Sequence, residues 1–301
     1  MVYTVTFNPS LDYILDVPNL VDGEVNRTTA ERIMPGGKGV NVSMVLDNLG
    51  IDNRAICFIA GFTGDAFKQL AYKRKMNADF IEIDEGTTRI NVKLRGDKET
   101  EINGQGPAIE QQYISQLYEK LGYLDEEDYL VLAGSLPDAM GNMVYKDIAQ
   151  MMEYTKCKVV VDATGDLLTN ALEHKPFLVK PNINELGKLF DTEIKNKEEA
   201  FTYAAKLHQM GARNVIVSMA SEGAIMLTED GDRYEMKAPK GIVKNSVGAG
   251  DSMMAGFLAG YIKEADYEKA FKLGVYTGSA SAFSEEMATK IEVESLMASN
   301  Q

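Results

Sequence analysis

Two glycines flank an alanine and lead directly into an aspartate in the stretch Gly248-Ala249-Gly250-Asp251. Glycine adopts backbone conformations that other residues avoid, so this turn can point successive N–H groups at one spot. The apolar run over 252–261 predicts a buried helix whose positive dipole end faces the same spot. A carboxylate there can accept a proton from an attacking hydroxyl while the amides hold a phosphate. The stretch favours phosphoryl transfer with Asp251 as base, although aspartate is also a preferred N-cap residue.

A second glycine-rich stretch, Pro35-Gly36-Gly37-Lys38-Gly39, lies far earlier in the chain. Apolar residues at 42, 45, 46 and 49, closed by Gly50, predict a helix directly after it. Glycines before a helix let a ligand approach closely, and Lys38 and Asn41 add a cation and an amide. A plain turn is the alternative interpretation. It is not a Walker A loop, because the Gly-x4-Gly-Lys-Ser/Thr spacing is absent.

The composition is that of a folded protein whose partners are small. The 301 residues are 45% hydrophobic and 25% charged, with a formal net charge of -14. That charge argues against a nucleic acid or an anionic membrane as partner, so small anions must bind in local pockets. Cys57 and Cys157 lie in apolar runs and are expected to be buried free thiols. No secretory leader and no apolar run of roughly 18 residues is visible, so we expect a cytoplasmic protein.

Continuous apolar strands alternate with amphipathic helices over most of the chain, which predicts an α/β fold with a mostly parallel central sheet covered on both faces. The segment 224–238 adds a strand pair around Asp230-Gly231-Asp232. Strands are predicted at 3–7, 54–60, 80–83, 129–133, 158–162, 177–180, 214–218, 224–228 and 234–238. Helices are predicted at 65–76, 109–121, 143–154, 183–190, 197–210 and 267–283, besides those that follow the two glycine stretches.

Two polar segments interrupt this alternation. Residues 13–34 show short polar and apolar alternation, and residues 87–103 alternate with period two about a Gly-Asp turn, so both are typical of antiparallel strands. We expect 12–34 and 88–103 to form a small β-sheet lid inserted in a core made of 1–11, 35–87 and 104–301. An exposed ribbon edge needs covering, and we therefore expect a homodimer formed through the lid.

Three motifs in this order and spacing, 35–41, Lys180-Pro181-Asn182-x-x-Glu185 and 247–251, resemble those of the ribokinase-like (PfkB) carbohydrate kinases. The resemblance covers essentially the whole chain. Within that family, the opening 6–12, the lysine of the early glycine loop and the stretch 88–94 resemble the phosphosugar branch, most closely the bacterial 1-phosphofructokinases. The resemblance implies ATP-dependent phosphorylation of fructose 1-phosphate at its 6-hydroxyl, which gives fructose 1,6-bisphosphate.

The resemblance also assigns roles at the sugar side. Asp251 is the base, and the Gly248-Ala249-Gly250 turn forms the anion hole. Arg89 and Lys38 neutralise the phosphate already on the sugar, and Arg27 reaches it from the neighbouring subunit's lid. Ser135 touches the substrate or caps a helix. The residues that hold the sugar itself are Asp12, Gly37, Lys38 and Asn41.

On the nucleotide side, the resemblance places Lys180, Asn182 and Glu185 near the ATP phosphates, with Glu185 holding Mg²⁺ through water. A carboxylate with an amide suits a hard cation that keeps its waters. A capping box formed by Asn182 and Glu185 is the alternative. Ser218 and Gly223 resemble the family's nucleotide loop, and Gly250 faces the same nucleotide. Asn245 stands where many members have an aspartate associated with a monovalent cation.

Other functions stay open at this point. Tagatose-6-phosphate kinases and 6-phosphofructokinases of the same family share all three motifs. A sugar-phosphate-binding or nucleotide-binding regulator without catalysis is a second class, but a carboxylate beside a bound phosphate would hinder mere binding. A dinucleotide-dependent oxidoreductase is disfavoured because no Gly-x-Gly-x-x-Gly follows the first strand.

Overall fold

The computed structural model describes residues 1–96, 99–137 and 140–300, and its centre is a nine-stranded sheet. The seven strands from β11 to β5 run parallel, and the strand pair at the other edge is antiparallel. The predicted mostly parallel sheet is therefore confirmed. Across the sheet its strands are β13 (Arg233–Met236), β12 (Ala224–Leu227), β11 (Asn214–Ser218), β10 (Leu178–Val179), β9 (Lys158–Asp162), β8 (Tyr129–Ala133), β1 (Val2–Thr6), β4 (Asn53–Ala60) and β5 (Ala78–Ile83).

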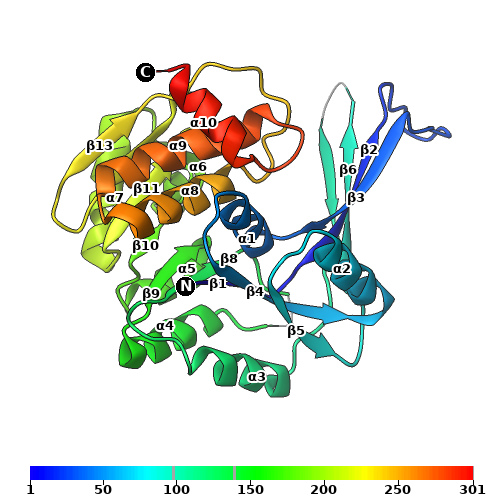
Figure 1. Ribbon diagram of the computed structural model, residues 1–301, viewed down its shortest axis with the longest axis horizontal. Helices are drawn as coiled ribbons and strands as arrows, with labels where there is room; N and C mark the ends of the chain where they lie inside the picture. The colour runs from blue at the N-terminus through cyan, green and yellow to red at the C-terminus, as the bar shows by residue number, and fades with distance from the viewer. Residues whose placement is uncertain (97–98, 138–139, 301) are drawn as a thin grey trace.

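Helices cover both faces of this sheet (Figure 1). Side chains alternate along each strand, so Leu130 and Leu132 of β8 enter one apolar cluster while Val131 enters the other. The first face carries α3 (Gln111–Leu121), α4 (Val144–Thr155), α5 (Gly165–Leu172), α6 (Ile183–Leu189) and α7 (Lys197–Met210). The opposite face carries α1 (Lys38–Asn48), α2 (Gly61–Lys73), α8 (Ala249–Glu264), α9 (Tyr267–Phe283) and α10 (Lys290–Ala298), and η1 (Ala220–Glu222) is a single 3₁₀ turn after β11.

Most predicted elements lie within two residues of their observed bounds, and the exceptions are one shifted helix and two helices that were not predicted. The helix predicted at 65–76 begins at Gly61, directly after β4. The helices α5 and α10 were not predicted at all. Both are short, and only α10 carries a clear start signal, the capping box formed by Thr289 and Glu292. Among the described residues, no helix has the length and apolarity needed to cross a membrane.

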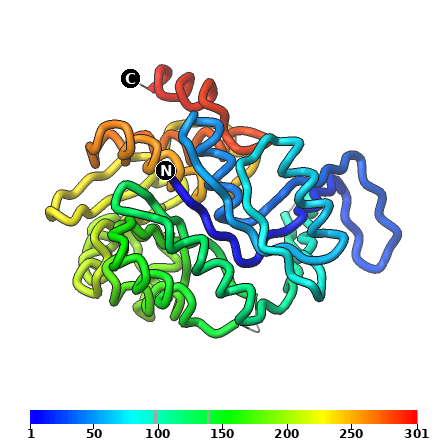
Figure 2. The backbone as a smooth tube through the Cα atoms, turned by 60° about the horizontal axis from the view of Figure 1, so that its bottom comes forward, coloured from blue at the N-terminus to red at the C-terminus, as the bar shows by residue number. Residues whose placement is uncertain are grey.

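A second sheet of four strands projects from the core (Figures 1 and 2). The predicted ribbon and hairpin both form, and the parallel pairing of β2 with β6 joins them. The hairpin turn at 97–98 lies outside the described residues. We call this element the small sheet. In spatial order its strands are β3 (Ala30–Gly36), β2 (Ser10–Asp16), β6 (Arg89–Arg95) and β7 (Thr100–Asn103).

The small sheet has one polar and one apolar face, because its side chains alternate with period two. On the polar face Asp12 of β2 pairs in register with Asn91 of β6. On the apolar face Tyr13 pairs with Ile33 of β3 and with Val92 of β6. Ile33, Ile90 and Ile102 are exposed. The polar face points to the candidate site described below, and the apolar face points away from it.

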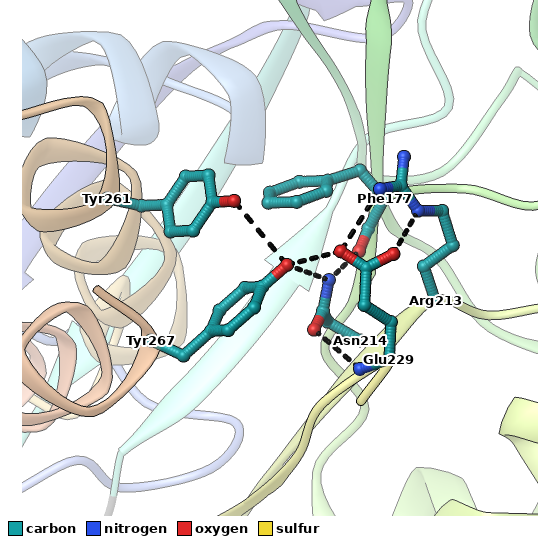
Figure 3. A network of polar contacts seen from close by, with 6 residues as sticks. All are labelled: Phe177, Arg213, Asn214, Glu229, Tyr261 and Tyr267. Atoms are coloured by element: carbon teal, nitrogen blue, oxygen red, sulfur yellow. Dashed lines mark hydrogen bonds and ion pairs between the residues drawn. The ribbon is translucent and has the colours of Figure 1, made fainter. Parts of the chain in front are cut away.

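A polar network ties the amino ends of β10 and β11 to helices α8 and α9 (Figure 3). The Tyr267 hydroxyl donates to Glu229 Oε1 at 2.5 Å, and Arg213 donates to both oxygens of the same carboxylate at 2.6 and 3.0 Å. Asn214 Nδ2 donates to the Phe177 carbonyl at 2.8 Å. Burial works against ionisation of Glu229, but Arg213 and Tyr267 outweigh it and hold its pKa below the ordinary value.

We expect Tyr267→Phe to lower the free energy of unfolding by about 1–2 kcal/mol, because a hydrogen bond to a charged acceptor is lost. Urea unfolding of the wild type and the variant measures this difference. Tyr154→Phe is the control, because Tyr154 is 86% exposed and should tolerate the change. Equal unfolding free energies for the two variants would contradict a stabilising role of the network.

Candidate active site

The late glycine stretch forms a left-handed turn at the start of α8. Gly248 is the N-cap residue of this helix and has φ +78°, a backbone conformation that residues other than glycine rarely adopt. Asn245 is buried, and its Oδ1 accepts from the backbone N–H of Val247 at 3.1 Å, which fixes the approach to the turn. The helix begins at Ala249, ahead of the apolar run 252–261 that predicted it. The first turn of the helix therefore opens next to Asp251, and the Ala249 amide in it also donates to the Ser246 carbonyl at 3.3 Å.

Asp251 connects the two glycine stretches in space. Its side chain is 6% exposed, and its Oδ2 accepts from Asn41 Nδ2 of α1 at 2.8 Å. Asn41 and Asp251 are 210 positions apart in the chain. Helices α1 and α8 pack against each other, so the contact is fixed by the core. The late anion-binding turn and the early cationic loop thus share one site.

Two lysines meet at one buried carboxylate on the floor of this site. Lys38 Nζ lies 3.1 Å from Asp162 Oδ1, and Lys180 Nζ lies 3.4 Å from Asp162 Oδ2. Burial disfavours the charged form of Asp162, but Lys180 and Lys38 outweigh it and lower its pKa. Burial likewise opposes the charge of Lys38, and the neighbouring carboxylates, Asp162 first, raise its pKa in spite of that. Lys38 is thereby held as a cation, and the same carboxylate fixes the position of Lys180.

The pKa of Asp251 is shifted in the opposite direction from that of Asp162. Burial, followed by the negative charge of Asp162, raises the pKa of Asp251 to about 6. Lys38 and the hydrogen bond from Asn41 act in the opposite direction. A carboxylate with a pKa near 6 is ionised at neutral pH and is still basic enough to take a proton in a reaction.

Two cavities adjoin the start of α8. Asn182, Ser218 and Gly250 line both of them, and Asp251 lines the smaller one. The smaller, about 380 Å³, holds the polar and charged groups of the small sheet and the early glycine loop. The larger, about 640 Å³, lies over β11 and the starts of α6 and α8. Of the predicted residues, the smaller cavity collects Asp12, Gly37, Lys38, Asn41, Arg89, Lys180, Glu185, Gly248 and Asp251, and the larger collects Gly223 and Ala249.

Two predicted substrate residues lie outside these two cavities. Ser135 lines a third space of about 350 Å³, together with Arg89 and Lys38, so it adjoins the smaller cavity. Arg27 is exposed in the connection between β2 and β3 and lines neither of the two cavities beside Asp251. Within a single chain Arg27 is therefore not part of the site.

Arg89 enters the smaller cavity from the small sheet. Its Nε donates to the Asn8 carbonyl at 3.0 Å and its Nη1 to the Gly104 carbonyl at 3.5 Å. Burial lowers the pKa of Arg89, with Asp12 acting against that shift. A bound anion would stabilise the positive charge of this half-buried guanidinium, because burial has removed part of the water that would otherwise stabilise it.

The strand-to-helix motif at 180–185 has the geometry of a helix cap. Asn182 Oδ1 accepts from the backbone N–H of Glu185, and Glu185 Oε2 accepts from the backbone N–H of Asn182, both at 2.8 Å. The capping box is therefore present. The Glu185 carboxylate also lines the smaller cavity. Gly223 has φ +89° and packs against the backbone of 236–238, where any side chain would collide.

Several site residues were missed in the sequence. Asp162 ends a correctly predicted strand, and the carboxyl ends of parallel strands are where ligand groups gather, so its position was a usable signal. Lys93 Nζ lies 2.7 Å from Asp12 Oδ2, and Asn91 Nδ2 donates to Asp12 Oδ1 at 3.1 Å. Asn103 lines the same cavity. Asn91, Lys93 and Asn103 lie on β6 and β7. The alternation of polar and apolar residues predicted these strands, but it did not predict which face of the small sheet would point toward the core.

A family model for the pfkB family carbohydrate kinases matches residues 5–293. The chain belongs to this family. It is 46% identical over 297 residues to a 1-phosphofructokinase of Bacillus subtilis, covering 99% of this chain and 97% of the relative. It is 33% identical to a D-tagatose-1-phosphate kinase of Bacillus licheniformis, covering 94% and 93% of the two chains.

Solved structures agree with this assignment. Phosphofructokinase-2 of Escherichia coli in complex with fructose-6-phosphate superposes with a TM-score of 0.92 at 26% identity, covering 99% of this chain and 98% of that one. A ribokinase of Arabidopsis thaliana superposes with a TM-score of 0.78 at 16% identity over 98% of each chain, and so shares the fold. This member of the family is a sugar kinase, and kinases of this family use ATP.

The raised pKa of Asp251 predicts that kcat/KM depends on pH. Because the base must be ionised to accept a proton, we expect kcat/KM to fall as the pH drops through about 6. Asn41→Ala removes a hydrogen bond that lowers this pKa, so the acid limb should move to higher pH. A phosphorylated sugar also titrates near pH 6. A limb that stays in place in the variant would therefore belong to the substrate and not to Asp251.

Proposed function

We propose that this kinase transfers the γ-phosphoryl group of ATP to the 6-hydroxyl of fructose 1-phosphate, which gives fructose 1,6-bisphosphate and ADP. The observation that carries the proposal is the position of Asp251, fixed by its contact with Asn41, on the wall of a cationic cavity that shares Asn182, Ser218 and Gly250 with a second, larger cavity. Relatives named 1-phosphofructokinase, at 46% and 37% identity, support this choice of sugar.

In the proposed reaction the sugar lies in the smaller cavity and ATP in the larger. The 6-hydroxyl gives its proton to Asp251 as its oxygen forms a bond to the γ-phosphorus. The bond from that phosphorus to the bridging oxygen breaks, and the electron pair leaves with ADP. The amides of Ala249 and Gly250 stabilise the charge on the transferring group, since they lie at the positive end of α8.

The remaining predicted residues bind the sugar phosphate and ATP at positions away from the reacting atoms. Arg89 and Lys38 bind the 1-phosphate, with Ser135 beside them. Asp12, Gly37 and Asn41 hold sugar hydroxyls, and the ion pair with Lys93 keeps Asp12 in place. On the other side, Lys180, Asn182, Ser218, Gly223 and Gly250 contact the nucleotide.

Magnesium fits this site as a mostly hydrated ion. Among the described residues, no cluster of three or more His, Cys, Asp or Glu side chains is arranged to hold a metal. Glu185, fixed by its capping contacts, lines the smaller cavity together with Asn182 and Gly250, which also line the larger one. It would therefore hold Mg²⁺ through water where the γ-phosphate of ATP enters the smaller cavity. When bound, the ion would neutralise charge on the phosphates.

An ADP-release assay over a panel of free sugars and sugar phosphates tests the substrate. We expect the largest kcat/KM with fructose 1-phosphate and no turnover of free fructose. The panel includes tagatose 1-phosphate and fructose 6-phosphate, which appear in the names of a relative and of a structural neighbour. It also includes tagatose 6-phosphate, because kinases of that sugar share the three sequence motifs. A higher kcat/KM with any of these would replace the proposed substrate, and turnover of free sugars alone would contradict a phosphate-binding site.

We also propose that the small sheet acts as a lid and pairs with a second copy of this chain. Its apolar face exposes Ile33, Ile90 and Ile102, and the connection from β2 to β3 exposes Leu20, Val21 and Val25. Such a face needs a partner. Pairing would place Arg27 of one chain near the other chain's sugar phosphate.

We expect Ile33→Asp to shift the sedimenting species from dimer to monomer, because a charge would be buried in the apolar contact. Analytical ultracentrifugation measures the change. Ile291→Asp, at an exposed residue of α10, is the control. A wild type that sediments as a monomer would contradict the dimer.

A further inference from the structure

The loop between α9 and α10 lies between the small sheet and the anion-binding turn. We call residues 284–288 the strap. Its backbone is anchored to the core, since the Ala288 amide donates to Ser281 Oγ at 2.9 Å and Asn48 Nδ2 donates to the Ala288 carbonyl at 3.0 Å. Sequence motifs gave this segment no role, and none of its residues lines either of the two cavities beside Asp251.

One side of the strap is paired with the small sheet. Glu285 Oε2 lies 3.5 Å from Arg32 Nη2 of β3 and 3.6 Å from Arg95 Nη1 of β6. These two arginines lie on either side of β2, on the polar face that also carries Asp12, and they pair in register with Ile14 and Asp16. A single carboxylate therefore contacts two strands of the small sheet, and one of them, β6, lines the smaller cavity.

The other side of the strap packs against the anion-binding turn. The Met287 methyl group lies against Gly248, so closely that a Cβ at position 248 would collide with it. Its sulfur accepts from Ser252 Oγ at 3.6 Å, and Ser252 lies on the first turn of α8 next to Asp251. The side chain also packs against both apolar clusters of this face, so it is held between the core and the turn.

A third observation shows how close these parts lie. A space of about 30 Å³ is enclosed by Ile14 and Arg95 of the small sheet, Val247 of the anion-binding turn, and Glu285 and Met287 of the strap. This is room for a water molecule and little more. A movement of the small sheet relative to the core must therefore displace the strap or break its ion pairs.

We propose that the strap couples the small sheet to the anion hole, with Glu285 and Met287 as positioning residues. When the small sheet settles over a bound sugar, Arg32 and Arg95 place Glu285, and Met287 then presses the Gly248 turn into the shape that holds the transferring phosphoryl group. Without the sugar the turn is less well ordered, and water attacks the γ-phosphorus of ATP less readily. The inference rests on the proposed function, since it needs a phosphoryl acceptor that the small sheet covers.

Glu285→Gln tests the link to the small sheet, and Glu286→Gln is its matched control. Both glutamates are exposed, at 59% and 51% of the side chain, but Glu286 pairs with Arg74 at the end of α2 and not with the small sheet. We expect Glu285→Gln to lower kcat about 3- to 10-fold with little change in KM for ATP, and the control to behave like the wild type. Because exposed ion pairs are weak individually, a larger loss is not expected.

Met287→Ala and Met287→Leu test the link to the anion hole. The alanine variant leaves Gly248 without its neighbour, and we expect kcat to fall at least about 10-fold, whereas leucine fills a similar volume and should retain most of it. The leucine variant keeps the test valid if the alanine variant fails to fold.

The deciding readout is the ratio of ADP released without sugar to ADP released with it. A merely structural role would lower both together, whereas the proposed coupling raises this ratio in Glu285→Gln and leaves it unchanged in Glu286→Gln. Equal ratios in both variants, or a kcat of Met287→Ala within twofold of the wild type, would overturn the proposal. The variants are assayed with whichever sugar phosphate the wild type accepts, so a wrong substrate assignment and a failure of the coupling give different results.

Discussion

Replacing Asp251 by asparagine is expected to lower kcat by about 10²- to 10⁴-fold, the range over which a general base contributes. Asparagine keeps the shape of the side chain and an oxygen that can accept from Asn41, so the geometry around the anion-binding turn should persist. The lost function is proton acceptance, which matters only as the new bond forms. KM for ATP and for the sugar phosphate should therefore change little.

Steady-state kinetics with both substrates varied measures this effect. Asp230→Asn, an exposed aspartate in the turn between β12 and β13, is the control and should retain full turnover. Thermal unfolding of both variants checks that the fold persists. Turnover of the Asp251 variant within a few-fold of the wild type would remove this residue from the mechanism.

Replacing Arg89 by methionine is expected to raise KM for the sugar phosphate by about 10- to 100-fold. Methionine keeps the unbranched stem but removes the charge. A charge-assisted hydrogen bond to phosphate contributes about 1.5–3 kcal/mol, and each 1.4 kcal/mol is a factor of ten. In the proposed reaction this contact holds the sugar phosphate before and during transfer, so kcat should fall much less.

Two further variants sharpen this test. Arg89→Lys restores a charge without the planar fork and should recover part of the lost affinity. Arg54→Met removes an arginine that pairs with Asp79 on the central sheet, far from the cavities in the fold, and should leave KM unchanged. An unchanged KM in Arg89→Met would show that another group binds the phosphate.

The sequence predicted the fold well where local pattern and burial agree. The strands at 129–133, 158–162 and 214–218 are continuous apolar runs, and the structure reproduces their bounds. The eight-residue helix α5 was missed because it is short, although its apolar residues at 167, 168, 171 and 172 have helical spacing. Helix α10 was missed although Thr289 and Glu292 form a recognisable capping box.

The site was predictable only in its glycine loops and its local motifs. Glycine stretches carry their own backbone requirements, so Gly248 and the loop before α1 could be identified without a fold. Asp162 gains its role from Lys38 and Lys180, which lie on other segments, and no local pattern contains that contact. The packing of Met287 on Gly248 is likewise a product of tertiary structure alone.

The most direct test of the account is ³¹P nuclear magnetic resonance of the reaction of this enzyme with fructose 1-phosphate and ATP. The account predicts that ADP appears together with one new phosphate monoester on carbon 6, while the resonance of the 1-phosphate persists, and that the Asp251→Asn variant forms neither product at a comparable rate. Release of inorganic phosphate without a bisphosphate, or an unchanged rate in the variant, would contradict it.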